Sequence, residues 1–202
     1  MRRRERLQVR IKTERLCLRE IEESDVEEVH AYSSDPEVSR YDPEPMPTFE
    51  TSQRLIQSII AVRDTQPRTK YFLAITLLPE ERLIGMVTLT VSPFTKGAEI
   101  GYSLHRGYWG HGYATEAARS LLEFAFTELG LHRVFADCHP ENSASVRVLE
   151  RLGMRREGHL RENDWFQDRW WDTLIYALLE DEWRAIKVHR PDEGGRISVS
   201  HR

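Results

Sequence analysis

Apolar and polar residues alternate in several stretches of the chain, and each such stretch predicts a β-strand. Residues 14–21 (ERLCLREI) show the pattern, with Leu16 and Leu18 on the inward side and Arg15 and Arg19 on the outward side. The other predicted strands occupy residues 70–77, 82–92, 98–104, 131–138, 154–166 and 169–179. The turn-like LPEE between residues 70–77 and 82–92 predicts that these two strands form an antiparallel hairpin.

Apolar residues three and four positions apart predict four helices among these strands. In the third helix Ala117, Leu121 and Ala125 fall on one apolar stripe, while Arg119 and Glu123 lie off it. The helices are expected over 23–35, 49–64, 114–129 and 142–153, with Ser24 and Asn142 or Ser143 as N-caps and Gly130 and Gly153 as stops. Four prolines predict a loop between the first two helices, over residues 36–48.

The elements follow the order strand, two helices, three strands, helix, strand, helix, two strands. Such interleaving favours an α/β (α+β) fold, one mixed sheet of about seven strands with helices on both faces. The 202 residues suit a single domain of this kind. We expect a basic N-terminal arm over residues 1–11, the folded domain over 12–186 and a flexible C-terminal tail over 187–202.

Composition and charge narrow the class of protein. The residues are 40% hydrophobic and 31% charged, with no apolar run long enough to cross a bilayer. The basic N-terminus lacks the apolar core of a secretion signal, so we expect a cytoplasmic protein with no membrane partner. The net charge of −4 argues against nucleic-acid binding. Cys17 and Cys138 are expected to be reduced thiols, and the spacing of the eight histidines predicts no metal site.

A glycine cluster lies between a predicted strand and the third helix, in the stretch HRGYWGHGYATEA over residues 105–117. A helix N-terminus presents unsatisfied N–H groups and a positive dipole end, and glycine lets an anion approach them. An isolated cluster of this kind is more often a simple turn, but its strand–helix context favours a phosphate site. The lysine of a P-loop is missing, and a dinucleotide fold would place its motif near the first strand. Arg106, His111 and Arg119 are either solvated or help to neutralise the phosphate.

This stretch, together with RVFADCHPENSASVRVLERLGMRREGHLRE and the later DRWWDTLIYALL, resembles the GNAT superfamily of acyl-CoA-dependent N-acetyltransferases over residues 12–183. Within it the chain is similar to ribosomal-protein N-terminal acetyltransferases of the RimJ/RimL type. The resemblance implies a mostly antiparallel sheet that splays open between the fourth and fifth predicted strands. It also implies acetyl-CoA as cofactor and an amine as acceptor.

The resemblance implies a coenzyme site made of the strand before the glycines, the glycine segment and the start of the fourth helix. The implied residues are Tyr102, Ser103, Leu104, Gly107, Tyr108, Trp109, Gly110, His111, Gly112, Tyr113, Ala114, Thr115, Asn142 and Ser145. Gly107 departs from the family pattern, which often has Gln or Arg there, so a side-chain contact is lost while the main-chain cradle is kept.

Acetyl transfer to an amine requires a neutral amine, a donor for the developing oxyanion and a proton for the departing thiolate. The resemblance points to Ser145 as proton donor, with Tyr176 as competitor; otherwise Ser145 satisfies local backbone groups. It points to Asp164 or Glu99 as base, with Glu162 as a third candidate. Family members transfer directly, which disfavours an acetylated Cys138.

The acceptor pocket is expected between the first two helices and the last hairpin. The loop there is acidic, through Asp35, Glu37, Asp42 and Glu44, and would attract a cationic amine. Trp165, Trp170 and Trp171 either line this cleft or pack in the core. The acceptor is a protein N-terminus or a small amine, and the protein is a monomer or a homodimer. The alternatives are a non-catalytic acyl-CoA sensor and a nucleotide enzyme.

Overall fold

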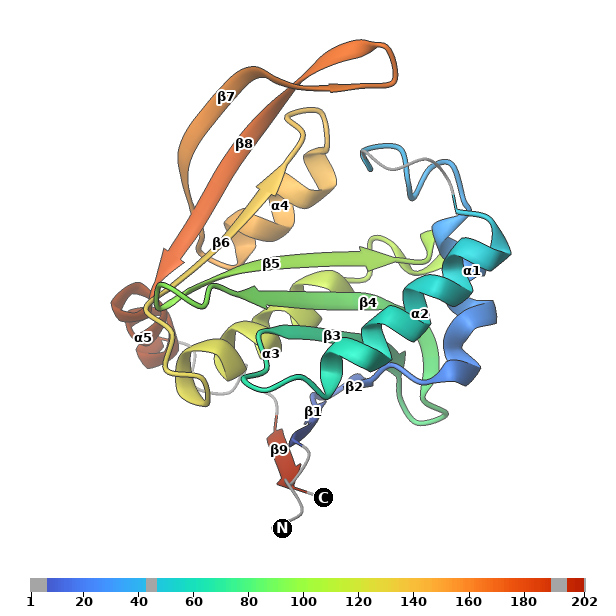
Figure 1. Ribbon diagram of the computed structural model, residues 1–202. Coiled ribbons are helices and arrows are strands. Elements are labelled where there is room, and N and C mark those ends of the chain that lie inside the picture. Colours follow the sequence, from blue (N-terminus) through green and yellow to red (C-terminus); the bar gives the residue numbers. More distant parts are fainter. Residues whose placement is uncertain (1–6, 43–46, 190–195, 202) are drawn as a thin grey trace.

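The computed structural model describes residues 7–42, 47–189 and 196–201, which build one open sheet covered by helices on both faces (Figure 1). Within these residues nine strands follow the spatial order β7-β8-β6-β5-β4-β3-β2-β1-β9. Their bounds are β1 (Leu7–Lys12), β2 (Leu16–Glu20), β3 (Lys70–Leu77), β4 (Arg82–Val91), β5 (Gly97–Leu104), β6 (Arg133–Cys138), β7 (Arg155–Phe166), β8 (Arg169–Leu179) and β9 (Arg196–His201). The predicted fold class is confirmed.

The helices occupy the predicted connections, with one addition at the C-terminal end. Their bounds are α1 (Val26–Ser33), preceded by the 3₁₀ turn η1 (Glu23–Asp25), α2 (Phe49–Arg63), α3 (Tyr113–Thr127), preceded by the 3₁₀ turn η2 (Arg106–Tyr108), α4 (Ser143–Arg151) and α5 (Glu180–His189). Gly130 and Gly153 end their helices with φ of +59° and +83°, a conformation that glycine adopts readily. The predicted stops are therefore confirmed.

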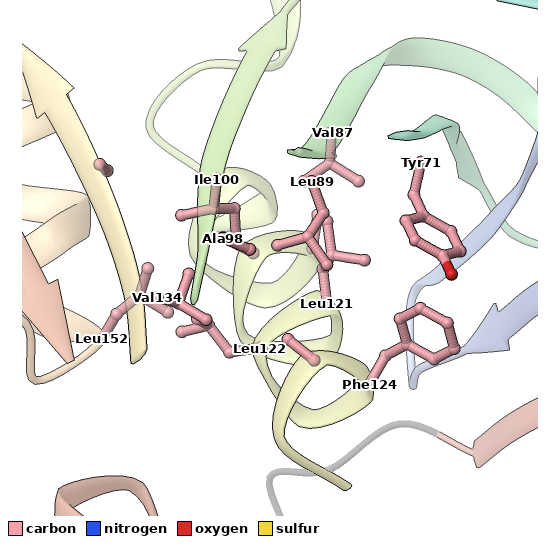
Figure 2. Packing of buried hydrophobic residues seen from close by; sticks show 14 of the residues in the cluster. Tyr71, Val87, Leu89, Ala98, Ile100, Leu121, Leu122, Phe124, Val134 and Leu152 are labelled. Carbon is pink, nitrogen blue, oxygen red and sulfur yellow. The ribbon is translucent and has the colours of Figure 1, made fainter. Parts of the chain in front are cut away.

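The main core lies between the sheet and α3 (Figure 2). Leu121, Leu122 and Phe124 of α3 are fully buried against apolar residues of β4, β5 and β6. A second apolar cluster lies on the opposite face, where α1 and α2 cover the sheet. The central strands are therefore buried on both faces, which explains why Cys17 of β2 is as inaccessible as its neighbours Leu16 and Leu18.

The sheet opens between β5 and β6, its one parallel pair among the described strands. Pairing runs from Gly97↔Arg133 to Glu99↔Phe135 and then ends, although β5 continues to Leu104. Beyond Glu99 the edge of β5 that faces β6 has no strand partner, and Figure 1 shows β6 and β8 turning away from it. The opening predicted between the fourth and fifth strands is thus confirmed.

The prediction for the two chain ends differs from the structure. Residues 7–11, assigned to a basic arm, belong to β1, where Val9 and Ile11 are buried. Residues 196–201, assigned to a flexible tail, form β9 and pair with β1 in antiparallel register. Both strands alternate apolar and polar residues (LQVRIK and RISVSH), but the prediction gave more weight to the basic and polar residues around them. Their pairing joins the two ends of the chain, which no local pattern predicts. Residues 187–189, also assigned to the tail, belong to helix α5 (Glu180–His189). Residues 1–6, 190–195 and 202 lie outside the described residues.

Three local predictions need correction or addition. Ser24 does not cap α1: it lies inside η1, where Glu22 and Asp25 form a capping box instead. Arg119 and Glu123, expected on the solvent side of α3, are buried, because α4 and α5 cover that side. Arg119 donates to a carbonyl oxygen of α4, and Glu123 accepts from Lys187 of α5 at 2.7 Å.

Candidate active site

A cavity of about 430 Å³ opens beside the splayed end of β5. Its walls come from four segments: the loop after α1, the end of β5, the glycine segment with the start of α3, and α4. The lining residues are Glu37, Val38, Arg40 and Tyr41; Tyr102, Ser103 and Leu104; Tyr108, Trp109, Gly110, Gly112, Tyr113, Ala114 and Thr115; and Glu141, Asn142, Ser143, Ala144, Ser145, Arg147, Val148 and Arg151.

The glycine segment presents a row of free backbone donors to this cavity. From Gly110 to Thr115, six consecutive N–H groups have no acceptor among the described residues, and all of these residues except His111 line the cavity. The first helical bond of α3 is donated by Glu116 to the carbonyl of Gly112. Because the positive end of the helix dipole lies at the same place, this segment forms an anion-binding cradle.

Side-chain and backbone details fit a phosphate group at the cradle. Gly110 and Gly112 both have φ of +81°, and a Cβ at Gly110 would enter open space. Glycine thus leaves the approach to the N–H groups unobstructed. The hydroxyl of Thr115 is buried without a hydrogen-bond partner among the described residues, although it lines the cavity. Such an orphan donor indicates a missing ligand, since buried polar groups are normally paired.

Gly107 and His111, two residues that the family resemblance assigned to the coenzyme, do not line the cavity. The N–H of Gly107 is already used, because it donates to Nδ1 of His105 at 3.0 Å. A Cβ at position 107 would lie 3.2 Å from the same Nδ1 atom, so the His105 ring leaves little room for a side chain there. Arg106 and Arg119 also lie outside the lining.

The cradle is tied to the end of β5 by hydrogen bonds. Nε1–H of Trp109 donates to the carbonyl of Leu104 at 2.9 Å, and the N–H of His105 donates to Ile84 of β4 at 2.8 Å. The latter bond sets the alternation along β5, which directs the N–H groups of Tyr102 and Leu104 toward the opening. These two groups can donate to a carbonyl oxygen placed between β5 and β6.

At the start of α4 Asn142 and Ser145 face the cavity together. Oδ1 of Asn142 accepts from the N–H of Ser145 at 3.1 Å, so Asn142 is the N-cap, one of the two residues predicted for that position. The Ser145 hydroxyl has no hydrogen bond with described residues, and the Tyr102 hydroxyl donates to the Ser145 carbonyl at 3.3 Å. Tyr176, the competing candidate for proton donor, is buried in the core and does not line the cavity.

Three carboxylates gather on the other face of the opening. Glu99 and Asp137 project from the same face of neighbouring strands, two positions apart in register. Both side chains are exposed, but partial desolvation, and then the Asp137 carboxylate, raise the pKa of Glu99, and partial desolvation, and then the Asp164 carboxylate, raise the pKa of Asp137. Asp137 was missed from the sequence, although the alternation of RVFADC places it on the side opposite Val134.

The two remaining candidates, Glu162 and Cys138, lie outside the cavity lining. Glu162 has φ of +50° and donates its N–H to the Asp172 carboxylate, outside the cavity lining. Cys138 lies at the end of β6, and burial raises the pKa of its thiol to about 11, which leaves it protonated at neutral pH. Such a thiol is a poor nucleophile.

The loop after α1 reaches across to the far side of the opening. The ring of Tyr41 stacks on His139 at 5.3 Å, and His139 in turn contacts Trp171 edge to face. Glu37 lines the cavity, whereas Asp35 accepts from the N–H of Glu37 in a local turn. Asp42 does not line the cavity, and Glu44 lies outside the described residues.

The three tryptophans of the last hairpin do not share one environment. Trp171 is buried, whereas Trp165 and Trp170 are more than half exposed and pack against each other near the hairpin turn. None of the three lines the cavity. The hairpin extends away from the body of the molecule (Figure 1).

The described residues contain neither a cluster of metal ligands nor a helix that could span a membrane. No group of three or more His, Cys, Asp or Glu is arranged to hold a metal ion. Within the same residues, every helix is too short or too polar to cross a membrane.

Comparison with known proteins gives a consistent result. Residues 15–155 match the family described as acetyltransferase (GNAT) domain. The chain is 37% identical over 173 residues to YnaD, an uncharacterized N-acetyltransferase of Bacillus subtilis (strain 168), which covers 86% of this chain and 98% of that protein. A GNAT-family acetyltransferase from Bacillus anthracis has a similar crystal structure, with a TM-score of 0.77, 36% identity and coverage of 86% and 99%. A ribosomal-protein-serine acetyltransferase of Escherichia coli (strain K12) is 30% identical over 106 residues, 52% of this chain and 59% of that protein.

Proposed function

This chain belongs to the acetyltransferase (GNAT) family, and we propose that its cavity binds acetyl-CoA while an amine enters from the opposite face of the opened sheet. As a family member it is an acetyl-CoA-dependent N-acetyltransferase. When bound, acetyl-CoA supplies the acetyl group as a thioester. The residue roles that follow are part of the proposal.

The observation that carries the proposal is the cradle. Six N–H groups from Gly110 to Thr115 lack acceptors among the described residues, and the buried Thr115 hydroxyl lacks a partner in the same place. A diphosphate supplies several acceptor oxygens at once, which suits a row of main-chain donors.

The end of β5 and the start of α4 supply the groups that act on the thioester and the pantetheine arm. Tyr102 and Leu104 donate their N–H groups to the thioester carbonyl oxygen, where negative charge grows during the reaction. Asn142 positions the pantetheine arm with its side-chain amide, which has two hydrogens not used by the cap. Ser145 gives its hydroxyl proton to the departing sulfur, or relays one from water.

The carboxylates on the other face receive the amine. A primary amine is mostly protonated at neutral pH and must lose a proton before it attacks. Glu99 accepts this proton, directly or through water, since partial desolvation and Asp137 raise its pKa above that of an ordinary carboxyl group and make it a stronger base. Asp164 adds negative charge beside Asp137 and favours a cationic acceptor.

The acceptor is an amine of one of two classes. A protein N-terminus is suggested by the name of the Escherichia coli relative, which acts on a ribosomal protein. A small amine fits the same carboxylates. We also propose that the protein is cytoplasmic and that it is a monomer or a homodimer. Its acyltransferase domain includes the predicted range 12–186.

The experiment follows free thiol from acetyl-CoA with a panel of N-terminal peptides and small amines. We expect amine-dependent thiol release with at least one class, and mass spectrometry should find one acetyl group on the acceptor nitrogen. Tight CoA binding without thiol release across the panel would support the sensor alternative instead. ATP or NAD competing with CoA would support a nucleotide enzyme.

A further inference from the structure

Two arginines on α4 face the cavity without a partner. Arg147 and Arg151 are both exposed and line the cavity wall, and neither guanidinium forms an ion pair with a described residue. Arginines elsewhere in the protein form close ion pairs, for example Arg19 with Asp25 and Arg68 with Glu20. Exposed arginines outside the cavity, such as Arg54, also lack an ion pair with a described residue, so what distinguishes Arg147 and Arg151 is their shared place in the cavity lining.

The spacing of the two side chains is unfavourable for the helix alone. Residues four apart lie on the same side of a helix, about 6 Å apart along its axis, and like charges at that spacing destabilise it. A doubly charged anion between them would turn this repulsion into attraction. Guanidinium groups suit phosphate in particular, because they donate two parallel hydrogen bonds to its oxygens.

The coenzyme carries two kinds of phosphate, and only one matches the cradle. The diphosphate suits the N–H row from Gly110 to Thr115. The 3′-phosphate of the ribose is a monoester with a charge of about −1.5 to −2, which calls for cationic side chains.

The wall supplies these cations at a suitable place. α4 starts with Asn142 beside the opening and ends against α3, where the Arg151 carbonyl accepts from Arg119 at 3.0 Å. Of the other charged residues in the lining, Arg40 stacks over Tyr41, while Glu37 and Glu141 belong to the opposite wall and the first residues before α4. Arg147 and Arg151 are thus the pair in the lining that one anion can bridge.

We propose that Arg147 and Arg151 bind the 3′-phosphate of coenzyme A and thereby let the protein distinguish CoA from dephospho-CoA. This inference rests on the proposed coenzyme site but concerns residues that neither the cradle nor the chemistry uses. Because both arginines are exposed, solvent screens part of each charge-assisted hydrogen bond, and we expect the two together to give a preference for CoA of roughly tenfold to hundredfold.

The test is calorimetric titration of CoA and dephospho-CoA into four proteins: wild type, R147Q, R151Q and the double variant. R54Q is the matched control, since Arg54 is an exposed arginine on α2, outside the cavity. We expect wild type and R54Q to prefer CoA by roughly tenfold to hundredfold, each single variant to lose part of the preference, and the double variant to bind both coenzymes with the wild-type affinity for dephospho-CoA. Circular dichroism checks that each variant is folded.

The outcomes separate this inference from the proposed function. A double variant that keeps the full preference, or a wild type that has none, overturns the role of the arginines while the coenzyme site stands. An equal loss of affinity for both ligands would place the arginines at a shared group, such as the diphosphate, and would also overturn it. If wild type binds neither ligand, the proposed function itself fails.

Discussion

A methyl group added at Gly110 tests the cradle with little disturbance elsewhere. Gly110 lines the cavity with φ of +81°, and a Cβ built there meets no heavy atom within 4 Å. Gly130, at the end of α3, provides a matched control, with φ of +59° and equally open surroundings but no place in the cavity lining. Gly110→Ala and Gly130→Ala therefore share their backbone strain and differ in position.

The magnitudes follow from these geometries. A non-glycine residue in the left-handed region costs about 1–2 kcal/mol, so each variant is expected to lose about that much stability. For a protein of this size that corresponds to a fall in Tm of roughly 2–8 °C. The Cβ of Gly110→Ala also stands between the N–H row and the diphosphate. Loss of one charge-assisted hydrogen bond, about 1.5–3 kcal/mol, weakens CoA binding roughly tenfold to hundredfold.

Thermal unfolding without ligand measures the loss of stability, and calorimetric titration with CoA measures the loss of CoA affinity. We expect similar Tm values for the two variants, with weakened CoA binding in Gly110→Ala alone. If Gly110→Ala binds CoA as wild type does, the N–H row is not the diphosphate site. If Gly130→Ala weakens binding equally, the loss comes from reduced stability and not from the cradle.

Three further predictions concern catalysis, pH and stability. Ser145→Ala should lower kcat at least tenfold with unchanged CoA affinity, and wild-type kcat would show that water or another group protonates the sulfur. Partial desolvation and Asp137 raise the pKa of Glu99, so its protonation stabilises the folded protein at low pH and this contribution is lost as the pH rises through the folded-state pKa. Glu99→Gln should therefore have a higher Tm than wild type above that pH, and should lose the acid limb of its kcat/KM profile; an unchanged profile assigns the base elsewhere. Glu20→Ala should cost about 3 kcal/mol in denaturant unfolding, since it leaves the buried Arg68 guanidinium without its bidentate partner. Arg184→Ala, which breaks an exposed pair, should cost less than about 1 kcal/mol, and equal losses would contradict this reasoning.

Local patterns predicted most of the fold because most elements have a local cause. The stripe of α3 appears in the sequence as alanines and leucines, and the structure buries Ala117, Leu121 and Ala125 completely. β1 and β9 lie next to each other at one side of the sheet, with β9 at its edge, and both were missed because their pairing joins the two ends of the chain, which no local pattern predicts. The burial of Arg119 was missed for a similar reason, since the helix that covers it follows later in the sequence.

In the candidate site, too, residues with a local signal were predicted and residues that depend on distant contacts were not. The glycine segment and Asn142 carry local signals, a row of glycines before a helix and an N-cap residue. The cavity wall formed by Tyr41 and its loop carries none, because it depends on stacking against His139 about a hundred residues later. Asp137 gained its importance only when the register of β5 and β6 placed it beside Glu99.

Residues 102–115 combine two tasks in one short segment, and this has a physical consequence. The N–H groups of Tyr102 and Leu104 face the opening, and the cradle begins at Gly110, with the Trp109–Leu104 hydrogen bond closing the turn between them. The distance between the carbonyl donors and the diphosphate donors is therefore held by one short stretch of chain and the hydrogen bonds within it, and not by packing between distant elements. A coenzyme bound at the cradle is thus positioned along the opening before any acceptor arrives, which lowers the entropic cost of bringing the thioester to the amine. The choice of amine then depends on a separate set of groups across the sheet, led by Glu99 and Asp137, so changes in acceptor preference need not disturb coenzyme binding.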